Sequence, residues 1–209
     1  MLTLAEHLKS MPVIAILRGV LPDQVLDVAQ ALLDAGITVI EVPLNSPNAT
    51  QSIGLLDKHL YGKGFFGCGT CVTVQQTKAV ANVGGKLMVT PNTNIEVIDQ
   101  AIKLGMTPVP GWATASEAFA AYYAGARYLK LFPAATYGVG HVKAVSAVLP
   151  KDAHILAVGG VGASNAQEWF AAGVSGLGIG SELYQAGQSA KDVHKRALEI
   201  VSSIEAIDR

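Results

Sequence analysis

Two ionisable side chains of this sequence stand where apolar residues are expected. Glu41 interrupts the apolar run 39–44, and Lys130 interrupts the run 128–132. Because successive side chains of a strand point to opposite faces, apolar neighbours that pack on one face turn Glu41 and Lys130 to the other. A buried charge is costly unless it is paired or functional, so these two residues are the first candidates for chemistry.

A lysine and a carboxyl group in one apolar site suit carbonyl chemistry through an imine. Burial disfavours an ammonium ion, which lowers the pKa of Lys130 and leaves a neutral amine that can attack a ketone. The protonated imine then acts as an electron sink, while Glu41 moves protons as acid and base. We expect both residues to be catalytic, with no metal or other cofactor, since the histidines show no ligand spacing. The alternative is an inert buried ion pair.

Glycine-rich segments follow two later apolar runs and predict a phosphate site. Gly159 and Gly160 end one run, and Gly180 and Ser181 end the next. Glycines let backbone N–H groups approach phosphate oxygens, and a serine adds a hydroxyl. The alternative is that these glycines only form tight turns.

Three further residues are candidate substrate contacts. Arg18 ends the first apolar run and suits a carboxylate or a phosphate, unless it forms only a surface pair. Thr70 follows the third run and could hydrogen-bond a carboxylate or keto oxygen, although an isolated threonine is more often a helix cap. Pro91 follows the fourth run, and we assign it to the same substrate contacts.

The composition limits the classes of partner. The chain has 209 residues, half of them apolar and 22 of them glycine, with 15 basic and 16 acidic side chains. This balance gives no electrostatic footprint for nucleic acid or an anionic membrane. No run reaches the roughly 20 apolar residues of a membrane span, and residues 1–11 lack the core of a signal peptide. We therefore expect a cytoplasmic protein that acts on a small molecule.

Cys68 and Cys71 form a C-x-x-C pair after the third apolar run. Two ligands alone do not make a zinc site. We interpret the pair as two reduced thiols near a strand end rather than as a metal or redox centre.

Short β-rich runs alternate with helix-period segments along the whole chain, which predicts a parallel sheet covered on both sides. An open doubly wound sheet would need a G-x-G-x-x-G loop after its first strand, but residues 17–22 read LRGVLP. We therefore expect one α/β domain over residues 1–209, a (β/α)8 TIM barrel with a short N-terminal helix and its site at the C-terminal ends of the strands. The expected strands are 13–17, 38–43, 64–68, 87–89, 107–109, 128–131, 155–158 and 176–179, and the expected helices are 22–35, 47–60, 73–83, 94–104, 114–124, 139–148, 163–172 and 189–206.

Five short segments follow one another along nearly the whole chain: IEVPL at 40–44, G-x-GT at 67–70, PVPG at 108–111, LKLFPA at 129–134 and VGG at 158–160. In this order they resemble the 2-keto-3-deoxy-6-phosphogluconate aldolase family. The resemblance implies a homotrimer of (β/α)8 subunits. It also implies reversible, class I cleavage of a 2-keto-3-deoxy-6-phospho sugar acid to pyruvate and glyceraldehyde 3-phosphate.

Carried over by position, the resemblance makes Lys130 the imine-forming residue and Glu41 the acid and base. It places Thr70 at the substrate and Phe132 in the wall of the pyruvate pocket. It assigns the phosphate to the loops that contain Gly159, Gly160, Gly180 and Ser181.

Three traits favour the galactonate-type branch, which acts on 2-dehydro-3-deoxy-6-phosphogalactonate. Asn45 stands where gluconate-type enzymes typically carry an arginine, Arg18 lies in an ILRG segment, and Val158 replaces a threonine before the glycine pair. In this branch Arg18 takes over an anion contact. The two substrates differ in configuration at C4, so the gluconate-type reaction remains the alternative. A phosphate-binding barrel isomerase or epimerase and a non-catalytic sugar-phosphate-binding barrel are further alternatives.

Overall fold

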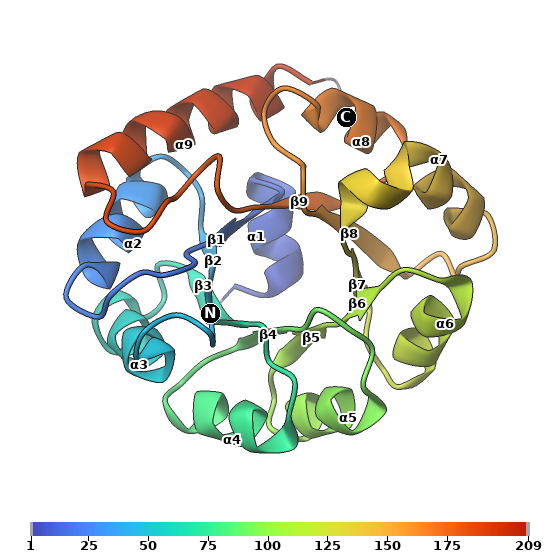
Figure 1. Cartoon of the computed structure of the whole chain (residues 1–209), viewed down its shortest axis with the longest axis horizontal. Helices are drawn as coiled ribbons and strands as arrows, with labels where there is room; N and C mark the ends of the chain where they lie inside the picture. The colour runs from blue at the N-terminus through green and yellow to red at the C-terminus, as the bar shows by residue number, and fades with distance from the viewer. Residues whose placement is uncertain (1, 208–209) are drawn as a thin grey trace.

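A computed structural model describes residues 2–207 as a ring of parallel strands enclosed by helices (Figure 1). The strands follow the order β5-β4-β3-β2-β1-β9-β8-β7-β6, and each neighbouring pair is parallel. The strands are β1 Val13–Ile16, β2 Val39–Pro43, β3 Phe65–Gly69, β4 Leu87–Val89, β5 Thr107–Val109, β6 Gly111–Trp112, β7 Tyr128–Leu131, β8 His154–Val158 and β9 Gly176–Ile179. The helices are α1 Leu4–Ser10, α2 Val25–Asp34, α3 Ala49–Leu60, α4 Val74–Asn82, α5 Ile95–Lys103, α6 Ala115–Tyr123, α7 Ala134–Ser146, α8 Ala166–Ala171 and α9 Ala190–Glu205.

The barrel closes where its fifth strand is interrupted. β5 and β6 stand at the two ends of the strand order, yet only Pro110 separates them in the chain. Proline has no N–H to donate to a ladder, so it divides this strand into two segments. The Pro110 carbonyl still accepts the N–H of Lys130 at 2.8 Å and joins the strand to β7. The expected (β/α)8 barrel is confirmed, and the two residues of β6 are the part that the strand prediction missed.

Local chemistry sets the helix ends. Thr73 and Thr114 each accept the N–H of the third helical residue, in capping boxes that begin α4 and α6. Gly36 and Gly173, with φ of 97° and 95°, adopt the left-handed conformation that ends α2 and α8. No helix within residues 2–207 has both the length and the apolar composition of a membrane span.

Helix α7 differs most from its expected range. Periodicity predicted a helix over 139–148, whereas α7 spans Ala134–Ser146 and contains a non-helical residue, Gly138, at φ 73°. The kink changes the direction of the apolar face, so only the second half of α7 carries a continuous helical period. α8 is shorter than predicted, Ala166–Ala171 rather than 163–172, and the side chain of its N-cap residue, Asn165, bonds the preceding loop.

Apolar side chains form two layers, one between the sheet and the helices and one inside the barrel. The inner layer includes Leu4 and Leu8 of α1, so this helix closes the N-terminal end of the barrel. Figure 1 shows α1 behind the centre of the ring of strands. The C-terminal ends of the strands form the end of the barrel that α1 leaves open. The other buried members of the inner layer are Ile14, Val39, Phe65, Leu87, Val89, Val109 and Leu156.

Candidate active site

Glu41 and Lys130 enter the barrel from β2 and β7. Glu41 pairs in register with Ile16 of β1 and Gly67 of β3, and Lys130 pairs with Gly111 of β6 and Leu156 of β8. The two side chains are only 2% and 6% exposed. The apolar neighbours on both strands belong to the outer layer, so alternation along the strand turns both ionisable groups inward.

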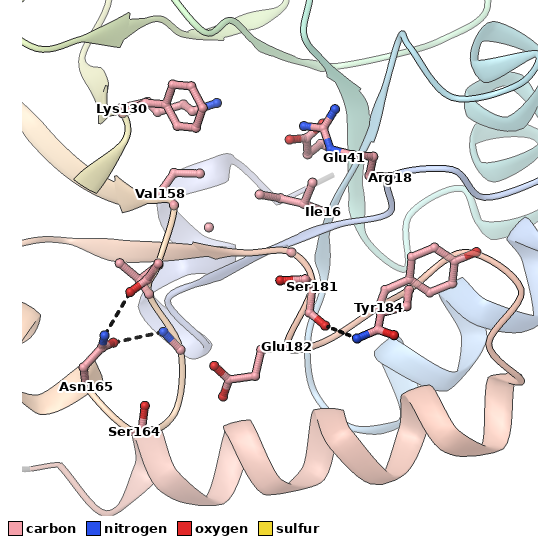
Figure 2. Close-up of a pocket in the computed structure, with 18 of the residues that line it drawn as sticks. Ile16, Arg18, Glu41, Lys130, Val158, Ser164, Asn165, Ser181, Glu182 and Tyr184 are labelled. Atoms are coloured by element: carbon pink, nitrogen blue, oxygen red, sulfur yellow. Dashed lines mark hydrogen bonds between the residues drawn. The ribbon is translucent and has the colours of Figure 1, made fainter. Parts of the chain in front are cut away.

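A cavity of ≈ 640 Å³ opens at the C-terminal end of the barrel and contains both side chains. Figure 2 shows Lys130 and Glu41 pointing into the same space from opposite sides. Most of the substrate contacts expected from the sequence also line it, which brings two distant halves of the chain together. These residues are Arg18, Phe132, Gly159, Gly160, Gly180 and Ser181.

Glu41 and Lys130 share the cavity without forming an ion pair. The ion pairs within 4.0 Å among the described residues are Lys103–Asp99 and Arg127–Asp152, both on the surface. The Lys130 Nζ atom lies 4.5 Å from the centre of the Phe132 ring, and the Glu41 Oε2 atom is buried without a hydrogen-bond partner. An inert buried ion pair does not describe this arrangement, since both groups remain available to a third molecule between them.

Burial moves the pKa values of the two groups toward each other. Desolvation raises the pKa of Glu41 from its usual 4.5 to about 7, although the positive charges of Lys130 and Arg18 act against this. Desolvation also lowers the pKa of Lys130; the Glu41 charge opposes this shift and the Arg18 charge adds to it. Burial thus favours the neutral amine of Lys130, and near neutral pH the Glu41 carboxyl group can both give and take protons.

Gly69 creates the space that the Glu41 carboxyl group occupies. A Cβ atom on Gly69 would overlap both oxygens of that carboxyl group. Gly69 ends β3 and pairs with Pro43 at the end of β2, so the glycine and the acid lie on adjacent strands. The absent side chain on β3 thus fixes the position of the acid on β2.

Arg18 and Asn45 meet at the rim of the cavity. The Arg18 Nη1 atom donates to the Asn45 Oδ1 atom at 2.8 Å, and Arg18 makes no ion pair with a described residue. The amide thus orients the guanidinium group without neutralising it, which leaves a charge available for an anionic group. Among the described cavity-lining residues, Arg18 and Lys130 are the cations.

The loop after β8 is held open by an asparagine that the sequence analysis missed. Asn165 donates to the Gly160 carbonyl at 2.9 Å and accepts the Gly162 N–H at 3.0 Å. Gly159 and Gly160 have φ of 96° and 73°, the left-handed region that favours glycine. An asparagine directly after a glycine loop is the signal that would have revealed this support, because its short amide bonds nearby backbone.

Thr70 and Pro91 do not line this cavity. Thr70 holds a left-handed backbone, φ 54°, which is strained for a threonine, and the cap of α4 is Thr73 rather than Thr70. The Pro91 backbone packs against Gly111, where a Cβ atom would collide with it. Their roles as substrate contacts stay predictions, and the cap alternative for Thr70 is wrong.

Cys68 and Cys71 are free thiols buried in the outer layer. A hydrogen bond between the two thiols is the main cause that raises the pKa of Cys68 and lowers that of Cys71 to about 7. Within the part of the chain that the structure describes, no three His, Cys, Asp or Glu side chains converge as metal ligands do.

A (β/α)8 barrel whose cavity holds a buried lysine opposite a buried carboxyl group belongs to the barrel enzymes that can work through covalent chemistry at an amine. The family model described as "Aldolase: KDPG and KHG aldolase" matches residues 4–199. The chain belongs to this family.

Individual relatives agree with the family assignment. The chain is 46% identical to a 2-dehydro-3-deoxy-6-phosphogalactonate aldolase of Escherichia coli (strain K12), over 92% of this chain and 94% of that protein. A solved native KDPGal structure is 45% identical, with a TM-score of 0.91 over 93% of this chain and 95% of that one. A KDPG aldolase from Legionella pneumophila, with pyruvate captured at low pH as a covalent carbinolamine intermediate, is 27% identical. Its TM-score is 0.82, over 98% of each chain.

Replacing Glu41 with glutamine should stabilise the fold at alkaline pH. The raised pKa means that the folded state binds the Glu41 proton more tightly than the unfolded chain does, so stability is lost as pH rises from 4.5 to about 7. Glu41→Gln removes this loss, which is roughly 3 kcal/mol at full ionisation. Urea unfolding should show a more stable variant at pH 8 and nearly equal stabilities at pH 4, below the usual pKa of the carboxyl group. A variant no more stable than the wild type at pH 8 would contradict this account of Glu41.

Replacing Gly69 with alanine should reduce turnover in aldol cleavage by roughly 100-fold, because the new methyl group displaces the Glu41 carboxyl group. Gly140→Ala is the matched control, since a Cβ atom there meets no other atom within 4 Å. The measurement is kcat for both variants, with circular dichroism to verify folding. Equal kcat values in the two variants would show that the position of Glu41 does not limit turnover.

Proposed function

We propose that this chain is a class I aldolase that reversibly cleaves 2-dehydro-3-deoxy-6-phosphogalactonate to pyruvate and D-glyceraldehyde 3-phosphate. The observation that carries the proposal is the pair Lys130 and Glu41, buried in one cavity without an ion pair between them. The cavity of ≈ 640 Å³ lies within the range of small-molecule sites, roughly 300–1,000 Å³.

Lys130 is the proposed nucleophile. Its neutral amine adds to the C2 ketone to give a carbinolamine, and loss of water gives a protonated imine. Burial favours this step because desolvation lowers the lysine pKa. The ring of Phe132, 4.5 Å from Nζ, forms one wall of the space in which the pyruvyl part of the substrate would lie.

Glu41 is the proposed acid and base. Directly or through a water molecule, it takes the proton of the C4 hydroxyl while the C3–C4 bond breaks. The bonding electrons move into the enamine and C4 becomes the aldehyde carbon of glyceraldehyde 3-phosphate. Glu41 then returns the proton to C3, and hydrolysis of the imine releases pyruvate and the free amine of Lys130. A pKa of about 7 suits a group that must both accept and donate a proton near neutral pH.

The relatives support both the proposed substrate and the proposed covalent mechanism. The Escherichia coli relative carries the name of the phosphogalactonate enzyme, and the Legionella pneumophila structure holds pyruvate as a covalent carbinolamine. The glycine loops after β8 and β9 are the proposed phosphate site, through Gly159, Gly160, Gly180 and Ser181, which all line the cavity. Remote binding of the phosphate would align the reacting carbons with Lys130 and Glu41.

Two cavity residues, Val158 and Arg18, and the Arg18 partner Asn45 favour the galactonate configuration over the gluconate one. Val158 is an apolar lining residue, where the gluconate-type enzymes typically carry a threonine. Arg18 is held by Asn45, the residue that stands where those enzymes carry an arginine. Compared with the gluconate-type enzymes, the proposed anion contact thus lies after β1, at Arg18, rather than after β2. Position 158 also offers no hydroxyl group to the substrate.

The same family resemblance supports a homotrimer and a cytoplasmic location, and we propose both. Thr70 and Pro91 complete the proposed set of substrate contacts. The left-handed Thr70 supports its inclusion, because strained backbone of this kind clusters at functional sites. A phosphate-binding isomerase or epimerase is less well supported, because such a reaction does not require the buried amine of Lys130.

Borohydride reduction in the presence of pyruvate should attach a reduced pyruvyl group to Lys130, detected by intact and peptide mass spectrometry. Lys130→Met should fold, lose the adduct and lose turnover by several orders of magnitude, because it removes the imine. The matched control is Lys143→Met, the same change at an exposed residue of α7 outside the cavity. A folded wild type that forms no adduct with ample pyruvate, or a Lys130→Met variant with near-normal activity, would sink the imine mechanism.

The two C4 epimers should differ by roughly tenfold or more in kcat/KM, in favour of the phosphogalactonate substrate. Coupling pyruvate release to an indicator enzyme measures both substrates under identical conditions. Reversed values would assign the chain to the gluconate-type reaction, and equal values would show that it does not discriminate the C4 epimers; neither outcome would affect the lysine mechanism.

A further inference from the structure

Glu182 places a carboxylate in the proposed phosphate site. It follows Ser181 in the turn after β9 and lines the cavity together with Gly162 and Asn165 of the loop after β8. Figure 2 shows Glu182 between Ser181 on one side and Ser164 and Asn165 on the other. A negative charge at this end is unexpected for a site that receives a phosphate dianion.

The Glu182 carboxylate accepts a hydrogen bond from a backbone N–H of the proposed phosphate loop. Its Oε1 atom accepts the N–H of Ala163 at 2.8 Å, and a Cβ atom on Gly162 would overlap the carboxyl group. Asn165 takes the neighbouring Gly162 N–H at 3.0 Å. The Glu182 carboxylate is thus bonded to a backbone N–H of the type that binds phosphate oxygens in such loops.

The solvent-exposed Glu182 side chain forms no ion pair with a described residue. Within residues 2–207, Glu182 has no cationic partner within 4.0 Å. The nearby Arg196 donates instead to the backbone carbonyls of Ser181 and Glu182, at 3.4 and 3.3 Å. The cations lining the cavity, Arg18 and Lys130, come from the ends of β1 and β7 rather than from the phosphate loops.

We propose that Glu182 is a specificity-determining residue: its carboxylate occupies the Ala163 N–H in the free enzyme, and the phosphate of the substrate must displace it. This inference rests on the proposed function for the location of the phosphate. The charge lowers the affinity for anions that contact only this end of the cavity, such as inorganic phosphate. A substrate that is also held at Lys130 and Arg18 can meet the cost through those contacts. Glu182 thereby restricts productive binding to molecules that span both ends of the cavity.

The test compares Glu182→Gln with the wild type. The glutamine oxygen can still accept the Ala163 N–H, so the variant removes the charge and keeps the loop contact. Isothermal titration with inorganic phosphate at constant ionic strength should show roughly tenfold tighter binding in the variant. The KM for D-glyceraldehyde 3-phosphate in the condensation with pyruvate should fall several-fold. The KM for unphosphorylated D-glyceraldehyde should not change.

The matched control is Glu199→Gln, an identical charge change at an exposed position of α9 outside the cavity, which should leave all three measurements at wild-type values. Phosphate binding that is unchanged or weaker in Glu182→Gln, or absent from both proteins, would overturn the proposal and leave Glu182 as a loop contact only. The titration does not depend on turnover. A wild type without aldolase activity would therefore refute the proposed reaction separately from the role of Glu182.

Discussion

The burial of Glu41 and Lys130 without a direct ion pair is the constraint on which the rest of the site depends. Water would solvate both groups and keep their pKa values far apart, whereas the barrel interior brings them toward neutrality. The fold has to offset this desolvation, and it does so through two apolar layers and a helix that closes the opposite end. Reactivity is thus obtained at the expense of folding stability.

The cavity is divided along its length into two chemically different ends. At one end, titratable side chains on β2 and β7 are fixed by strand register, which holds them rigidly inside the barrel. At the other end, the cavity is lined by glycines and short polar side chains of the loops after β8 and β9. Strands therefore position the reacting groups, while loops provide the adaptable contacts.

The sequence predicted the barrel and its central pair because both depend on local periodicity. Alternation along a strand is enough to decide that Glu41 and Lys130 point inward. Features that depend on how neighbouring strands fit together were missed: the two-residue β6 beyond Pro110, and the loop contacts of Asn165 and Glu182. For Thr70, strand order alone could not decide whether a residue at a strand end faces this cavity.

The contact between Gly69 and Glu41 couples substitutions at these two positions on adjacent strands. The Glu41 carboxyl group fills the volume that any side chain on β3 would need at Gly69. A larger residue there becomes compatible only if the acid on β2 is shortened or moved at the same time. Each single change passes through a form with a displaced acid, so laboratory evolution of this cavity would meet strong epistasis at the pair. Libraries intended to widen the cavity near β3 should therefore vary both codons together.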